Sequence, residues 1–284
     1  MGLPTVRPGE LSGFRQAGAR VRIPNGKFLK GDCKERKAAA NMNPVALVQA
    51  WWAKQHITLA EEPPGSRQGL CSPPDQGRDL EPLTMLVVGD SMAVGCGVKD
   101  QSQGFVPDIA ACLAARLGRP VSWATQGRLG ATIRRVRYRF LPALKDHPDL
   151  LVLCAGSNDI MANRTDEQWR DDLAASIELA KNKGHQVLVL SSGQLYRDPA
   201  LGRALRAEVE RRIARQTQTS LQVCQEASVP FVDATRDDVG TDRPDFWGID
   251  HFHPGIEGYR RMAACVVDHI PQDLIDQLSV NAHS

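Results

Sequence analysis

The sequence predicts an α/β fold, in which helices cover both faces of a five-stranded parallel sheet in a three-layer α/β/α sandwich. Five short apolar runs are the first observation, and they cover residues 84–88, 121–125, 150–155, 187–191 and 229–233. Continuous apolar runs are typical of parallel strands that are buried on both faces. A helical stretch separates each run from the next, and this alternation requires right-handed crossovers that place helices on both faces of the sheet. Ligands bind such sheets at the carboxyl ends of the strands.

The helical stretches begin and end at recognisable residues. The first ends at Gly118, and the third begins with a capping box of Thr165 and Gln168 and ends at Gly184. The last follows Pro254, which suits a first helical turn. Apolar side chains recur at helical spacing in the first, third, fourth and last stretches: Phe105, Ile109, Leu113 and Leu117; Trp169, Leu173, Ile177 and Ala180; Leu201, Leu205, Val209 and Ile213; Ile256, Tyr259, Ala263, Val266 and Ile270.

The chain divides into four expected parts: a disordered extension over residues 1–41, an amphipathic helix and connector over 42–83, the α/β domain over 84–275 and a tail over 276–284. The extension is rich in Gly, Lys and Arg and shows no periodicity. The connector over 61–82 has five prolines and three glycines and is expected to be irregular. The helix should dock on the domain through an apolar side, with an interfacial membrane anchor as the alternative. That side comprises Val45, Val48, Trp51, Trp52 and Leu59.

Composition excludes several classes of protein. The net charge of +2 comes from residues 1–41, and the rest of the chain holds 26 Lys and Arg against 30 Asp and Glu, so nucleic-acid binding has little electrostatic support. The seven cysteines have no Cys-x-x-Cys spacing, which favours buried free thiols over disulfides or a zinc site, and the histidines and acidic residues show no standard metal-binding spacing. No secretory signal or membrane-spanning segment is visible. We therefore expect a cytoplasmic protein, without metal or cofactor and without membrane contact.

Two segments supply the residues for acyl transfer. Ser91 follows the first apolar run in a Gly-Asp-Ser turn, and Asp250 and His253 lie in Asp-His-Phe-His-Pro. These are a nucleophile, a carboxylate that orients a base, and the base itself. A serine that merely caps a helix is the alternative for Ser91. His251 competes for the role of base, but neighbouring side chains in an extended stretch point in opposite directions.

Two further polar segments have the chemistry of oxyanion donors. Asn158 follows the third run in Gly-Ser-Asn-Asp, and Gly130 ends Gly-Arg-Leu-Gly after the second. Asn158 would donate through its amide, and Gly130 and Ser91 through their backbone N–H groups. An ordinary turn glycine is the alternative for Gly130.

The order and content of these four segments resemble the SGNH (GDSL) hydrolase family of esterases and lipases, and the resemblance covers residues 84–270. It implies a flavodoxin-like sheet and the catalytic positions Ser91, Asp250 and His253. The expected function is a serine carboxylic-ester hydrolase that needs no cofactor and acts on small acyl esters through an acyl-enzyme.

Several functions compatible with the same fold stay open. A thioesterase, a lysophospholipase and a carbohydrate deacetylase share this chemistry. A non-catalytic binding module and a membrane-associated acyltransferase are alternatives of other classes. Met92, Phe246 and Trp247 are expected to line the substrate pocket. Packing of the loop against the last helix is the alternative for the two aromatic residues.

Overall fold

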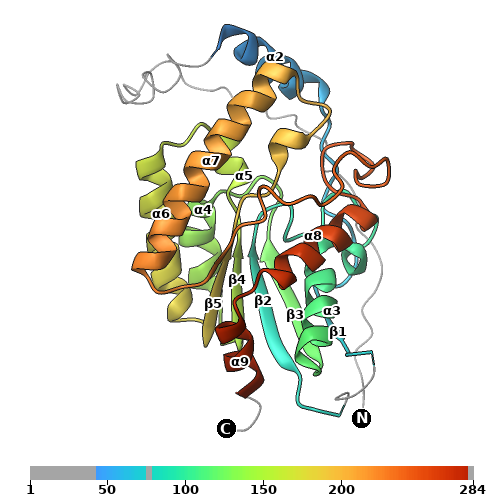
Figure 1. Cartoon of the computed structure of the whole chain (residues 1–284), viewed down its shortest axis with the longest axis vertical. Helices are drawn as coiled ribbons and strands as arrows, with labels where there is room; N and C mark the ends of the chain where they lie inside the picture. Colours follow the sequence, from blue (N-terminus) through green and yellow to red (C-terminus); the bar gives the residue numbers. More distant parts are fainter. Residues whose placement is uncertain (1–42, 75–78, 281–284) are drawn as a thin grey trace, which may run out of the picture.

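Six strands form one sheet in the order β1-β3-β2-β4-β5-β6 (Figure 1). The structure is a computed structural model that describes residues 43–74 and 79–280, so the predicted extension over 1–41 lies outside the described residues. The strands are β1 Gln68–Cys71, β2 Leu83–Gly89, β3 Val121–Gly127, β4 Leu150–Cys154, β5 Gln186–Leu190 and β6 Phe231–Val232. Strands β2 to β6 are parallel and follow the flavodoxin-like order. The predicted fold class is confirmed.

The sixth strand, β1, was not predicted. It lies within the connector that was expected to be irregular, and it pairs antiparallel with β3 from Gln68↔Ala124 to Cys71↔Val121. Only backbone pairing marks β1 as a strand, because it has no apolar run and Leu70 is exposed. A short edge strand of this kind leaves little trace in hydrophobic periodicity.

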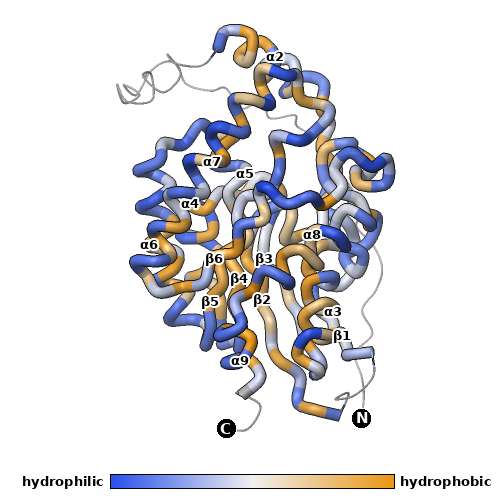
Figure 2. The backbone as a smooth tube through the Cα atoms, in the orientation of Figure 1, coloured by the Kyte–Doolittle hydropathy of each residue, from blue (hydrophilic) through white to orange (hydrophobic). Residues whose placement is uncertain are grey.

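Helices cover both faces of the sheet, and the central strands are strongly hydrophobic (Figures 1 and 2). Met85 and Val87 of β2 belong to one core with α3 and α8, whereas Val88 belongs to a second core with α6. The helices in chain order are α2 Pro44–His56, α3 Phe105–Leu117, α4 Ile133–Arg135, α5 Ser157–Met161, α6 Asp166–Lys181, α7 Arg203–Glu226, α8 Ile256–Asp268 and α9 Gln272–Val280. Short 3-10 or π turns cover 101–103, 136–143 and 195–197.

The predicted helix signals are present. Gly118 ends α3 in the left-handed conformation, with φ of 64°, and Thr165 and Gln168 form the capping box of α6. The helix α6 ends at Lys181 with Asn182 as its C-cap, short of the predicted end at Gly184. Residues 276–280 of the predicted tail belong to α9, where Leu278 is fully buried against the α3 and α8 core, and residues 281–284 lie outside the described residues.

The N-terminal helix α2 docks on α7, but through the face opposite to the predicted one. Ala46 and Ala53 are buried, and the Gln49 side chain accepts a 2.9 Å hydrogen bond from the Leu205 N–H in the first turn of α7. A side chain at Gly202 would overlap Gln49, so the two elements approach too closely for large residues. The predicted docking residues Val45, Val48, Trp51, Trp52 and Leu59 are all exposed. Within the described residues, no helix is long and apolar enough to cross a membrane.

Candidate active site

Close packing of three strand ends places Ser91 at the carboxyl edge of the sheet. A Cβ at Gly89 would lie 1.8 Å from the Cys154 carbonyl oxygen, and a Cβ at Gly127 would lie 2.6 Å from the Gly89 oxygen. Only glycine allows β2, β3 and β4 to converge in this way. The chain turns sharply after Asp90, whose N–H donates to the Cys154 carbonyl across 3.1 Å. Ser91 is the first residue of that turn.

The segment that contains Asp250 and His253 folds around the Asp250 carboxylate. Oδ2 lies 2.6 Å from Nδ1 of His253, and Oδ1 accepts hydrogen bonds from the backbone N–H groups of Phe252 and His253. The Ala60 N–H donates to Oδ2 across 2.8 Å. Burial acts to raise the Asp250 pKa, but the hydrogen bonds from His253 and Ala60 outweigh it and hold this pKa below its ordinary value. The carboxylate is therefore ionised at neutral pH and orients the imidazole through Nδ1.

Two glycines bring this segment against the turn that follows Ser91. A Cβ at Gly97, which has φ of 102°, would lie 2.8 Å from the His253 Cβ and 2.5 Å from the Pro254 carbonyl oxygen. A Cβ at Gly248 would lie 2.4 Å from the Gly97 oxygen. The Tyr259 hydroxyl of α8 donates to the Cys96 carbonyl across 2.5 Å. As a result, Ser91 and His253 line the same cavity.

His251 lies outside the cavity. Its side chain is exposed, its φ is 54°, and its N–H donates to the Gly248 carbonyl across 3.1 Å. His253, by contrast, is 4% exposed. Of the two histidines in this segment, only His253 contacts the Asp250 side chain and lines the cavity that Ser91 also lines.

The three predicted oxyanion donors are the backbone N–H groups of Ser91 and Gly130 and the side-chain amide of Asn158. Among the described residues, no acceptor receives a hydrogen bond from the backbone N–H of Ser91 or of Gly130. Gly130 has φ of 76° and is exposed, and its neighbour Leu129 lines the cavity. Asn158 also lines the cavity, and its amide donates to the Ala131 carbonyl across 3.0 Å and to Asp90 Oδ2 across 3.4 Å. These contacts orient the Asn158 amide and use both of its hydrogens, so the longer contact, to Asp90, is the one that would open for an oxyanion.

The cavity has a volume of about 210 Å³ and a mainly apolar lining. All three predicted pocket residues line it: Met92, Phe246 and Trp247. Phe246 is almost fully buried and meets Trp247 edge-on at 4.9 Å between ring centroids, so this pair both packs the loop and forms the wall. The prediction missed further apolar lining residues: Leu59, Leu129, Met161, Leu195, Phe252 and Met262. Leu59 comes from the segment after α2, where no sequence signal points to the site.

Asp90 and Asp159 support the loops of the site. Asp90 accepts from the Met92 N–H, and Asp159 accepts from the Ile133 N–H at the start of α4. Burial raises the pKa of Asp90 to about 6 and that of Asp159 to about 7. For Asp159, burial raises the pKa by more than the Arg164 guanidinium, 3.7 Å away, lowers it.

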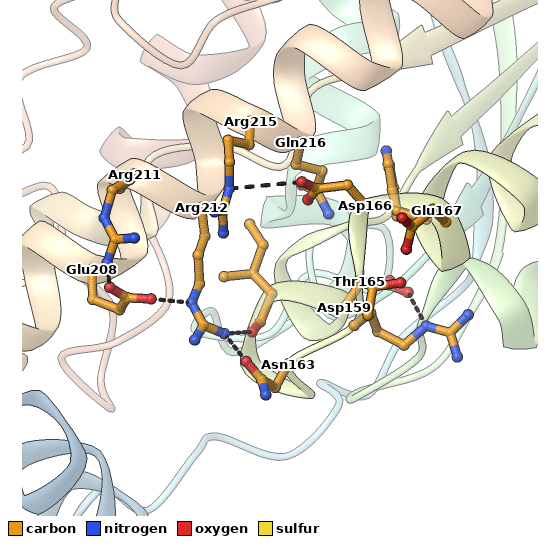
Figure 3. Close-up of a pocket in the computed structure, with 13 residues that line it drawn as sticks. Asp159, Asn163, Thr165, Asp166, Glu167, Glu208, Arg211, Arg212, Arg215 and Gln216 are labelled. Atoms are coloured by element: carbon orange, nitrogen blue, oxygen red, sulfur yellow. Dashed lines mark hydrogen bonds and ion pairs between the residues drawn. The ribbon is translucent and has the colours of Figure 1, made fainter. Parts of the chain in front are cut away.

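A second cavity, of about 230 Å³, lies on the far side of Asp159 between α5, α6 and α7 (Figure 3). Its lining is charged, and its side chains are largely paired with one another. Arg212 lies 2.6 Å from Glu208, which also pairs with Arg211, and Arg215 lies 3.8 Å from Asp166. We interpret it as an ion-pair network that joins the helices, since it contains no nucleophile paired with a base.

Comparison with known proteins identifies the family. The model of the GDSL-like lipase/acylhydrolase family matches residues 87–261. The chain belongs to this family. That range contains every predicted catalytic and oxyanion residue but excludes Ala60, which also contacts Asp250. Among curated protein sequences, none is significantly similar to the chain.

Solved structures share the fold of this GDSL-family chain at low sequence identity. TesA is 23% identical, with a TM-score of 0.51 over 66% of this chain and 97% of that chain. A variant of an acetyl xylan esterase from Geobacillus stearothermophilus is 16% identical, with a TM-score of 0.51 over 68% and 95%. LAE5, an alpha/beta hydrolase enzyme from the metagenome of Lake Arreo, Spain, is 18% identical, with a TM-score of 0.50 over 71% and 97%. The chain is thus a hydrolase of the SGNH/GDSL family, with the fold of that family.

Proposed function

We propose that this hydrolase cleaves small carboxylic esters through an acyl-enzyme on Ser91. The observation that carries the proposal is the 2.6 Å contact between His253 Nδ1 and Asp250 Oδ2 beside a cavity that Ser91 also lines. Because the ionised carboxylate accepts from Nδ1, the His253 Nε2 bears the lone pair that a general base needs.

In the proposed reaction, Ser91 Oγ attacks the ester carbonyl while His253 Nε2 takes its proton. The backbone N–H groups of Ser91 and Gly130 and the Asn158 amide stabilise the oxyanion. The imidazolium, stabilised by Asp250, then gives its proton to the leaving alcohol. Water repeats the sequence on the acyl-enzyme, so that the acid is released and the Ser91 hydroxyl is restored.

The size and lining of the cavity support a short acyl chain. Its volume of about 210 Å³ is below the roughly 300–1,000 Å³ of sites for drug-sized ligands. Met92, Phe246 and Trp247 present apolar surface, which suits an alkyl group better than a sugar or a charged headgroup.

The test is a panel of p-nitrophenyl esters of increasing acyl length, with Ser91→Ala as the control. We expect the highest kcat/KM for short chains and a loss of roughly 10⁴- to 10⁶-fold in kcat for Ser91→Ala. Near-normal turnover by a folded Ser91→Ala variant would refute the mechanism. A preference for long chains would refute the proposed substrate size but not the mechanism.

A further inference from the structure

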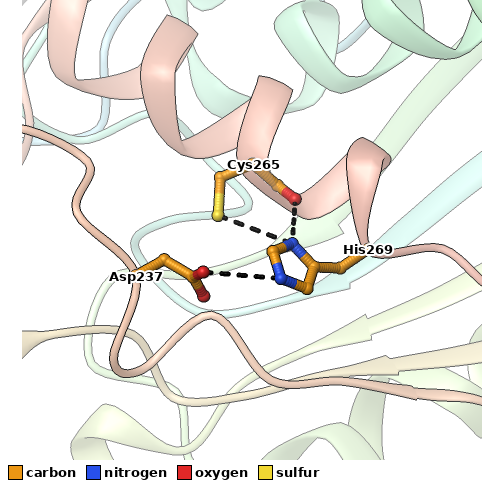
Figure 4. A group of neighbouring side chains, drawn as sticks. All are labelled: Asp237, Cys265 and His269. Atoms are coloured by element: carbon orange, nitrogen blue, oxygen red, sulfur yellow. Dashed lines mark hydrogen bonds and ion pairs between the residues drawn. The ribbon is translucent and has the colours of Figure 1, made fainter.

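Three side chains that could bind a metal meet away from the catalytic residues (Figure 4). Asp237 lies in the loop after β6, and Cys265 and His269 lie at the end of α8, four residues apart and therefore on one face of the helix. One potential ligand atom from each lies within 4.8 Å of the other two. His269 Nε2 lies 3.4 Å from Asp237 Oδ1, and Nδ1 lies 3.8 Å from the Cys265 sulfur.

The hydrogen bonding of His269 defines which ring nitrogen is free. Nδ1 lies 2.8 Å from the Cys265 backbone carbonyl, which can only accept, so Nδ1 carries a hydrogen. In the neutral ring, Nε2 then has a bare lone pair, and it faces a carboxylate oxygen of Asp237. An imidazole lone pair and a carboxylate oxygen repel each other at this distance unless a proton or a metal ion lies between them. Histidine ligands of metals commonly have this arrangement, with one nitrogen on the metal and the other donating to a carbonyl.

We propose that Asp237, Cys265 and His269 bind a zinc ion, with a fourth position open to water. Thiolate, imidazole and carboxylate are the ligands that zinc takes in proteins. With zinc bonds of about 2.0–2.1 Å, tetrahedral geometry separates a nitrogen ligand and an oxygen ligand by about 3.3 Å. The observed separation between Nε2 and Oδ1 is 3.4 Å. On coordination, Cys265 gives its thiol proton to solvent.

The location of the site gives the ion a structural role. The Asp237 and His269 side chains are 33% and 46% exposed, so an ion can enter from solvent. Gln194, which lines the active-site cavity, donates to the backbone carbonyls of Ala234 and Asp237. Zinc would therefore join α8 to the loop that leads from β6 to Phe246, Trp247 and Asp250. This inference does not depend on the substrate proposed above.

The first experiment titrates the tag-free full chain, stripped with a chelator, with Co²⁺ and then Zn²⁺. We expect one ion per chain, a thiolate-to-cobalt charge-transfer band, and displacement of cobalt by zinc. Zinc at 100 times its Kd should raise Tm by roughly 5–10 °C. Absence of the cobalt band in the wild-type chain would overturn the proposal, whatever the behaviour of the variants.

Matched variants then assign the ligands. Cys265→Ser should remove the charge-transfer band, and His269→Gln and Asp237→Asn should each weaken zinc binding by about 10-fold or more. The control is Cys112→Ser, since Cys112 is another free and partly buried cysteine in the described part of the chain. The control should bind zinc like the wild type. Loss of the band in Cys112→Ser, or its persistence in Cys265→Ser, would refute the assignment.

Discussion

Replacing Ala60 by proline should impair catalysis, although Ala60 lies outside the family match and its side chain does not line the cavity. Its N–H is one of four donors to Asp250, and it shares Oδ2 with Nδ1 of His253. Proline has no N–H, so Ala60→Pro removes this donor without replacing any residue that lines the cavity. Fewer hydrogen bonds then hold the Asp250 carboxylate in the orientation that points Oδ2 at the imidazole.

The expected loss follows from the strength of that bond. A hydrogen bond to a charged acceptor contributes about 1.5–3 kcal/mol. At about 1.36 kcal/mol for each tenfold change in rate, loss of the whole contribution in the transition state lowers kcat by about 10- to 150-fold. The upper limit is the loss of about 10⁴-fold seen when a triad carboxylate is replaced outright. KM should change little, because Ala60 makes no wall of the cavity.

The assay is steady-state hydrolysis of a short p-nitrophenyl ester, with melting temperature as the check on folding. Glu61→Pro is the matched control, because Glu61 is exposed and its N–H donates to no acceptor among the described residues. Full kcat in Ala60→Pro, or an equal loss in Glu61→Pro, would refute the role of this hydrogen bond.

Three further predictions concern the site and its support. His253→Asn should lower kcat by about 10⁴-fold or more. His251→Asn should keep a kcat near that of the wild type, because asparagine tolerates the positive φ at position 251. Equal kinetic defects in the two variants would contradict the assignment of the base. Trp247→Ala should enlarge the pocket and move the optimum in the ester panel to longer acyl chains, since each methylene in an apolar pocket is worth about 1–3 kcal/mol. An unchanged chain-length profile with a lower Tm would assign Trp247 to packing alone. Because burial raises the folded pKa of Asp159 to about 7, the folded state binds this proton more tightly than the unfolded state, and the stability it contributes is lost as pH rises from about 4 to 7. Asp159→Asn should therefore be more stable relative to wild type at pH 8 than at pH 5, as measured by urea unfolding. A stability difference that does not vary with pH would refute the shift.

The sequence predicted the sheet and the candidate site because both depend on local signals. Apolar runs mark β2 to β6, and the ends of parallel strands necessarily meet at one edge of the sheet. Ser91 and Asn158 each follow a strand directly, so their neighbourhood could be inferred without coordinates. Asp250 and His253 are three residues apart, and their contact arises within one short turn.

Features that depend on approach between distant segments could not be predicted. The face of α2 that docks was predicted wrongly, because large apolar residues usually mark the buried side of a helix, whereas here a close contact near Gly202 favours Ala46 and Ala53. Strand β1 was missed because its backbone hydrogen bonds to β3 define it, and its side chains show no apolar pattern. The proposed zinc ligands show the same limit: Cys265 and His269 are near each other in sequence, but Asp237 reaches them only through the fold.

The surroundings of Asp250 show how much of the site lies outside the family's motif segments. Within the described part of the chain, its Oδ1 accepts only from backbone N–H groups of its own turn, at Phe252 and His253, so that half of the carboxylate is fixed locally. Oδ2, the atom that contacts the imidazole, is fixed instead by Ala60, which comes 190 residues earlier. Leu59, beside it, lines the cavity. The segment after α2 thus contacts both the Asp250 carboxylate and the cavity that Ser91 lines, and we expect a variant that displaces it to alter catalysis without a change in any motif residue.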